Sequence, residues 1–230
     1  MKKHLISTLI LTFSSSVFAA SVDDLRWIGQ DYKPYSYVNE AGERAGSSVA
    51  LVNKIMGKIG STKQVKDIEI HAFSRMFVHQ NNDPNTVFFP LARTPDREDY
   101  FKWVGPIAMD EPVFFAKKSK NIIIKSDGDL NQYKIAGRDG YGPVKSLNNV
   151  DLGDSDQEDL QKLQADQVDL VICNKASCLA TMQDQGMKID DYKIVYSMQT
   201  SDLSLAFNKE TDDKLIEQVK KALEEIKIGK

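Results

Sequence analysis

The sequence predicts an α/β protein in which mostly parallel sheets are flanked by helices. Strand-like and helix-like patterns alternate from residue 26 to residue 91 in the order β-α-β-α-β, and a second series of this kind starts near residue 133. Such alternation is typical of parallel sheets with helices on their faces. Binding sites on these sheets open at the carboxyl ends of the strands, so the residues that follow each strand are the first candidates for function.

The N-terminus has the pattern of a secretory signal peptide. Two lysines and a histidine at residues 2–4 precede the apolar run 5–13, and residues 17–19 have the small-x-small form that signal peptidase cuts, so we expect cleavage after Ala19. The apolar run is too short to span a bilayer. We therefore expect residues 1–19 to be removed and the mature chain to be periplasmic.

Composition favours a globular domain and argues against a nucleic-acid partner. Hydrophobic residues make up 41% of the chain, which is enough to bury a core, and 30 basic against 33 acidic residues give a net charge of -3. Nucleic-acid binding needs a concentrated basic face, and no long run of one charge sign occurs.

The first part of the chain supplies one strand-helix-strand unit. Residues 26–29 and 68–72 have strand patterns, and the helix between them has apolar residues at helical spacing. Ser47 or Ser48 is the expected N-cap of that helix.

A pair of arginines follows the next strand. Phe73 starts a second helix, the chain turns at 81–85, and the apolar strand 87–91 leads into a Pro-Asp turn flanked by Arg93 and Arg97. The planar arginine fork matches a carboxylate through two parallel N–H bonds, so a small anionic solute is the natural ligand there. The alternative is that one or both arginines pair on the surface with a nearby acid, namely Asp96, Glu98 or Asp99.

A glycine turn in the second half is a further candidate for anion binding. An apolar strand at 109–116 leads away from the first series, and a strand at 133–137 runs into a turn with Gly140 and Gly142. Glycines that open a helix leave backbone N–H groups free to meet an anion, although they also simply make turns. The remaining expected elements are a helix with a Ser155–Glu158 capping box, strands at 168–172, 193–196 and 203–207, and a final helix capped by Thr211.

The two cysteines, Cys173 and Cys178, are expected to form a disulfide. In an oxidising compartment an even pair is interpreted first as a bridge, provided that the Cα atoms come within about 7 Å. The alternative is a pair of buried free thiols. A zinc site is not indicated, because nothing in the sequence completes a ligand set.

The order of strand, T-P-x-R turn and aromatic patch ending in Gly-Pro resembles the periplasmic solute-binding proteins of the polar amino-acid type (family 3). The resemblance covers nearly the whole mature chain. It implies a type II periplasmic-binding-protein fold with two lobes, each a mostly parallel sheet flanked by helices, joined by two hinge strands. Lobe 1 is then residues 20–111 plus 203–230, and lobe 2 is residues 112–202.

The resemblance also implies a ligand site between the lobes. The arginine of the T-x-x-R turn, here Arg97, binds the ligand carboxylate, and Tyr32 covers the ligand from one side. The alternative for Tyr32 is that its ring packs locally in the loop. The turn in the second lobe meets the ligand through its amides, with Tyr141 in place of the usual threonine. The candidate ligand-binding residues are Tyr32, Phe89, Arg93, Arg97, Arg138, Tyr141, Gly142 and Asn174.

Asn174 departs from the pattern of the resembled family, which usually places an aspartate there to bind the ligand's α-ammonium group. A neutral amide supplies no full countercharge, and a buried unpaired charge costs several kcal/mol. Either another acid such as Asp139 or Asp31 substitutes, or the ligand is not an ordinary α-amino acid. Of these, we favour the second.

The expected function is capture of a small carboxylate-bearing metabolite, an amino acid or related organic acid, for import by an ABC permease. No cofactor or metal is expected, and the chain should be a monomer. One alternative is a periplasmic enzyme of the same fold, of a dehydratase-like kind, although only Glu111, Asp139 and Lys175 could titrate near the inferred cleft. Another is a sensor module that reports solute to a membrane partner.

Overall fold

The computed structural model of the chain describes residues 20–76 and 83–229. The expected signal peptide at residues 1–19 lies outside the described residues, as do the end of the second predicted helix and part of the turn at 81–85. No helix within the described ranges is long and apolar enough to cross a membrane.

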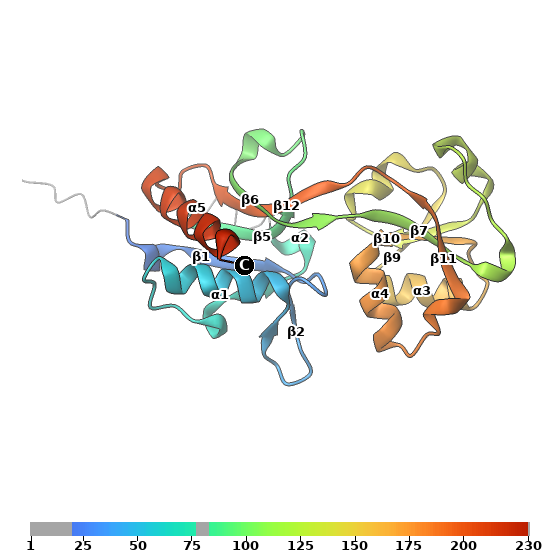
Figure 1. Cartoon of the computed structure of the whole chain (residues 1–230). Helices are drawn as coiled ribbons and strands as arrows, with labels where there is room; N and C mark the ends of the chain where they lie inside the picture. The colour runs from blue at the N-terminus through green and yellow to red at the C-terminus, as the bar shows by residue number, and fades with distance from the viewer. Residues whose placement is uncertain (1–19, 77–82, 230) are drawn as a thin grey trace, which may run out of the picture.

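Two separate five-stranded sheets organise the molecule into two lobes, connected by two long crossing segments (Figure 1). In the first lobe the strand order is β4-β1-β5-β12-β6. β1 pairs in parallel with β4 and β5, whereas β12 lies antiparallel between β5 and β6, so only β12 is reversed. The strands are β1 (Arg26–Gln30), β4 (Glu69–His71), β5 (Thr86–Ala92), β6 (Phe101–Asp110) and β12 (Ser201–Asn208).

The second lobe repeats this arrangement with the order β11-β7-β10-β8-β9. β10, β8 and β9 pair in parallel, and only β7 runs against its neighbours. The expectation of mostly parallel sheets is therefore confirmed for both lobes. The strands are β7 (Pro112–Lys117), β8 (Ile135–Arg138), β9 (Val150–Gly153), β10 (Leu170–Asn174) and β11 (Tyr192–Ser197).

Helices cover the sheets of both lobes (Figure 1). In the first lobe α1 and α5 bury their apolar faces on a core that includes Trp27 and Phe89. In the second lobe α3 and α4 cover a core around Val171. The α-helices are α1 (Ser47–Lys58), α2 (Phe73–Met76), α3 (Asp156–Gln164), α4 (Lys175–Asp184) and α5 (Asp213–Ile228), and a small hairpin comprises β2 (Tyr37–Val38) and β3 (Arg44–Ala45). The 3₁₀ helices are η1 (Val22–Asp24), η2 (Val65–Asp67), η4 (Glu98–Tyr100), η5 (Lys118–Lys120), η6 (Asp127–Gln132), η7 (Gly142–Ser146) and η8 (Ile189–Asp191).

The expected apolar strand at 109–116 is in fact two strands in different sheets. β6 ends at Asp110 and pairs with β12, and β7 begins at Pro112 and pairs with β10 and β11. Proline cannot donate to a strand ladder, which fits its position at the first residue of β7. The break between the two strands falls where the chain passes from one lobe to the other.

The predicted helix caps are partly wrong. Gly46, not Ser47 or Ser48, is the N-cap of α1; its φ of 114° favours glycine, and a Cβ there would lie 2.4 Å from the Tyr35 carbonyl oxygen. Asp212, not Thr211, caps α5.

The capping box expected at Ser155 and Glu158 forms only in part. The Ser155 side chain accepts from the Glu158 backbone N–H, as expected. The Glu158 carboxylate, however, accepts from the backbone N–H of Asp154 rather than from that of Ser155. The short edge strand β9, which was not predicted, ends just before this cap.

The predicted disulfide between Cys173 and Cys178 is confirmed. The cysteines lie at the end of β10 and in α4, with their Cα atoms 6.1 Å apart. The bridge therefore fixes the start of α4 to the end of a central strand of the second lobe.

Candidate functional site

A cleft of about 640 Å³ lies between the two lobes. Its walls come from the end of β1, the turn after β5, both crossing segments and the turn after β8, which are strand ends, as expected for a sheet of this kind. The lining residues are Gln30, Tyr32, Phe73, Leu91 to Arg97, Asp110, Pro112, Arg138 to Pro143, Lys145 and Gln199 to Leu203.

Arg97 is a half-buried cation in this cleft. The backbone N–H of Arg97 donates to the Thr94 carbonyl and closes the turn after β5. The Nη1 of Arg97 donates to the Ala92 carbonyl at 3.2 Å. The guanidinium lies 5.3 Å from the centre of the Phe73 ring. Burial lowers the pKa of Arg97, but arginine stays charged in proteins. Among the described residues no carboxylate forms a salt bridge with it.

Arg93 lies in a different environment, although it also lines the cleft. Its Nε donates to Glu98 Oε2 at 2.8 Å and its Nη2 donates to Oε1, so one edge of the guanidinium forms a bidentate pair with the carboxylate. Both side chains are exposed. The surface pairing considered from the sequence therefore holds for Arg93 and not for Arg97.

The second lobe contributes a cation that stacks on the aromatic residues of the cleft. The Arg138 guanidinium lies 4.9 Å from the centre of the Tyr32 ring and 5.9 Å from that of Tyr141. In this conformation Arg138 therefore occupies a face of Tyr32. Gly142 also lines the cleft, but it starts the 3₁₀ helix η7, with proline following it, rather than an α-helix.

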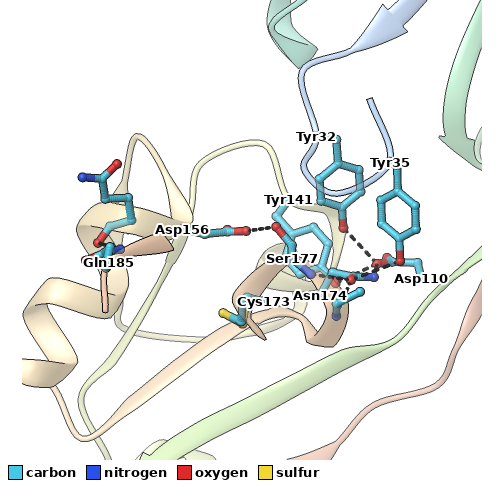
Figure 2. Close-up of a disulfide and its surroundings, with 12 residues drawn as sticks. Tyr32, Tyr35, Asp110, Tyr141, Asp156, Cys173, Asn174, Ser177 and Gln185 are labelled. Atoms are coloured by element: carbon cyan, nitrogen blue, oxygen red, sulfur yellow. Dashed lines mark hydrogen bonds between the residues drawn. A yellow bond between two sulfur atoms is a disulfide. The ribbon is translucent and has the colours of Figure 1, made fainter. Parts of the chain in front are cut away.

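Asp110, a residue that sequence reasoning missed, is at the centre of a hydrogen-bond network joining the lobes (Figure 2). Its Oδ1 accepts from the hydroxyls of Tyr32 and Tyr141, both at 3.1 Å, and from Asn174 Nδ2 at 2.6 Å. Burial raises the pKa of Asp110, and these hydrogen bonds offset part of that rise. The signal in the sequence was a pair of acids, Asp110 and Glu111, within an otherwise apolar run.

Two predicted ligand contacts do not line the cleft. Phe89 is fully buried in the core of the first lobe, 6.4 Å from Trp27 between ring centres. Both faces of β5 are covered, so successive side chains enter different cores, and Phe89 faces the helix side. Asn174 is 1% exposed and caps α4, where its Oδ1 accepts from the backbone N–H groups of Ala176 and Ser177.

The two acids considered as substitutes for the missing aspartate differ in position. Asp139 lines the cleft, whereas Asp31 does not. Burial raises the pKa of Asp31, and Arg138 lowers it in part.

The sequence matches the family described as bacterial extracellular solute-binding proteins, family 3, over residues 27–229. The chain belongs to this family. The resemblance inferred from the sequence is thereby confirmed, and the family is one of binding proteins. No curated protein matches the chain.

Several solved structures have a similar fold. A mutant of ArgBP from T. maritima has a TM-score of 0.73 and 19% identity, with 90% of each chain covered. A histidine kinase sensor domain with similarity to periplasmic binding proteins has a TM-score of 0.76 and 18% identity, covering 90% of this chain and 92% of that one.

A third similar structure is an ABC uptake transporter substrate binding protein from Streptococcus pneumoniae with bound histidine. Its TM-score is 0.71 at 17% identity, with 88% of this chain and 87% of that chain covered. At these identities the likeness establishes the two-lobed fold.

Proposed function

We propose that this protein captures a small carboxylate-bearing metabolite between its two lobes and that Arg97 holds the carboxylate. The supporting observation is that the Arg97 guanidinium lines the cleft without a salt-bridge partner among the described residues, whereas Arg93 has its fork occupied by Glu98. A half-buried guanidinium held beside an aromatic ring can bind a carboxylate by donating two parallel hydrogen bonds to it. A cleft of about 640 Å³ has room for one small metabolite.

Binding would proceed by closure of the lobes on the solute. We take lobe 1 as residues 20–111 plus 203–230 and lobe 2 as residues 112–202, hinged where the chain crosses between the sheets. The first lobe would hold the carboxylate, and Arg138, Tyr141 and the amides around Gly142 would meet the solute from the second. The ligand favours the closed form because it contacts both lobes at once, and its differential affinity sets the population shift.

Import through an ABC permease from the periplasm is the role we favour, with the chain acting as a monomer and not as an enzyme. The similar substrate binding protein of an ABC uptake transporter supports this role. The similar histidine kinase sensor domain supports sensing as a second candidate. The genes beside this one discriminate, because an importer requires a permease and an ATPase whereas a sensor requires a signalling partner.

The test is a thermal-shift screen of amino acids, 2-oxo acids and dicarboxylates on the wild type, followed by affinity measurements on Arg97→Ala. Loss of a charged, bidentate contact costs about 1.5 to 3 kcal/mol or more, so affinity should fall between tenfold and several hundredfold. Arg93→Ala is the matched comparison and should lose less than about tenfold, because its charge is already paired and exposed. Undiminished binding by a folded Arg97→Ala protein would disprove the proposal.

A further inference from the structure

Asp110 is a buried carboxylate with one oxygen unused. The residue is 4% exposed and lines the cleft. All three hydrogen bonds that it accepts, from Tyr32, Tyr141 and Asn174, end on Oδ1. Oδ2 accepts none from the described part of the chain, so it remains available to a solute in the cleft.

The charge of Asp110 also has no salt-bridge partner among the residues that the structure describes. Arg138 is close enough to lower the pKa of Asp110, but it stacks on tyrosine rings and forms no salt bridge with the carboxylate among the described residues. Arg97 lines the same cleft and likewise forms no salt bridge with the described residues, and the two opposite charges influence each other. Burying a charge is costly unless it is paired, so an unpaired anion and cation in one cleft form a complementary site for a solute carrying both signs.

Asn174 fixes the position of this carboxylate. Its Oδ1 is held by the first amides of α4, and its Nδ2 donates to Asp110 Oδ1 at 2.6 Å. The hydrogen bonds to Oδ1 therefore fix the orientation of the Asn174 amide, and its Nδ2 in turn fixes the position of the Asp110 carboxylate. The negative charge expected at position 174 is thus present in the fold, one hydrogen bond away, on the crossing strand β6.

We infer that Asp110 is the specificity-determining anion of the cleft and that it selects solutes that carry an ammonium group as well as a carboxylate. This inference rests on the proposed function, in which Arg97 takes the carboxylate. Asp110 Oδ2 accepts a hydrogen bond from the ligand ammonium, and Asn174 acts as a positioning residue that touches no ligand. The alternative favoured from the sequence, a ligand without an α-ammonium group, follows only if position 174 must itself supply the charge.

The experiment compares pairs of probes that differ only in the ammonium group. Isothermal titration of the wild type is carried out with the standard L-amino acids and with the 2-oxo acid that corresponds to each one that binds. We expect at least one L-amino acid to bind, and its 2-oxo acid to bind on the order of a hundredfold more weakly. Asp110→Asn should lose this preference, because the amide cannot supply the countercharge.

A second variant, in which positions 110 and 174 exchange their side chains, keeps the inference testable if Asp110→Asn does not fold. The double variant Asp110→Asn with Asn174→Asp moves the carboxylate across the same hydrogen bond, and aspartate is also a good N-cap for α4. We expect it to recover much of the preference for the ammonium compound. Asp190→Asn, an exposed aspartate on η8 away from the cleft, is the matched control and should behave as the wild type.

The outcomes separate this inference from the proposed function. Equal binding of a 2-oxo acid and its L-amino acid by the wild type overturns the inference even if Asp110→Asn cannot be purified. So does an unchanged preference in folded Asp110→Asn, or the failure of every L-amino acid to bind. If Arg97→Ala weakens binding at least tenfold while Asp110→Asn preserves the preference, the carboxylate site stands and only the ammonium assignment fails. If folded Arg97→Ala binds as tightly as the wild type, the proposed function itself is wrong.

Discussion

Asp159 offers a sharp test of the energetics of the second lobe. This carboxyl group on α3 is fully buried, and neither of its oxygens has a hydrogen-bond partner in the described part of the chain. It lies beside the buried Asp156, which accepts a hydrogen bond from Ser177 (Figure 2). Burial, followed by the charge of Asp156, raises the pKa of Asp159 to about 7 from an ordinary value of 3.8.

The sign of the effect on stability follows from that rise. The folded state holds the Asp159 proton more tightly than the unfolded state does, so this contribution is complete below pH 3.8 and is lost as the pH rises through about 7. At 1.36 kcal/mol per pH unit, the gap between the two pKa values corresponds to at most about 4 kcal/mol of unfolding free energy. For a chain of this size, that is a melting-temperature change of up to roughly 10 °C.

The assay is thermal melting of the wild type and Asp159→Asn at about pH 5 and about pH 8 at fixed ionic strength. The asparagine cannot ionise, so the variant should melt higher than the wild type at about pH 8 and should lose less stability between the two pH values. Asp190→Asn, an exposed substitution of the same kind, controls for the general change in charge. If Asp159→Asn loses as much stability as the wild type over this range, the reasoning is refuted.

Three further perturbations test the fold. Glu69→Gln removes a carboxylate whose pKa is lowered to about 2, chiefly by a hydrogen bond from the arginine at the start of β1. Because that carboxylate is 35% exposed, we expect the unfolding free energy to fall by less than about 1 kcal/mol at neutral pH, as measured by urea unfolding. This difference between variant and wild type should shrink as the pH falls towards 2, and a larger difference in acid would contradict the reasoning. Reduction of the Cys173–Cys178 bridge, with a sequence separation of 5, should cost about 2 kcal/mol, and a melt unaffected by reductant would count against it. Gly105→Ala would place a Cβ 2.3 Å from Ser204 Oγ, so we expect the unfolding free energy measured with denaturant to fall by about 1 to 3 kcal/mol. If the variant is as stable as the wild type, β12 can shift at little cost and the prediction is wrong.

The regular elements were predictable because their signals are local. Apolar periodicity located β5, β10 and the long helix α5, since each pattern is contained in a few consecutive residues. The division of residues 109–116 into β6 and β7 was not predictable in this way. An apolar run indicates a buried strand but not which of two sheets buries it.

The same distinction between local and long-range signals applies to the residues of the candidate site. The place of Arg97 in the cleft was predictable because its turn has a recognisable local sequence. Asp110 was missed because its hydrogen-bond network is formed with residues 31, 64 and 78 positions away along the chain, which no local pattern reveals. Phe89 was also predicted to contact the ligand but lies in the core of the first lobe. A strand covered on both faces gives no sequence signal of which side each ring enters.

The position of β12 makes the order of synthesis matter for assembly. Every strand of the second lobe comes from one continuous stretch, residues 112–197, whereas β12, at residues 201–208, fills the place between β5 and β6. In a chain that emerges N-terminus first, the lobe begun earliest is finished last. Until β12 arrives, β5 and β6 each present an open edge to solvent, and such edges recruit foreign strands. The interval before residue 201 emerges is therefore when a nascent chain most needs protection from aggregation.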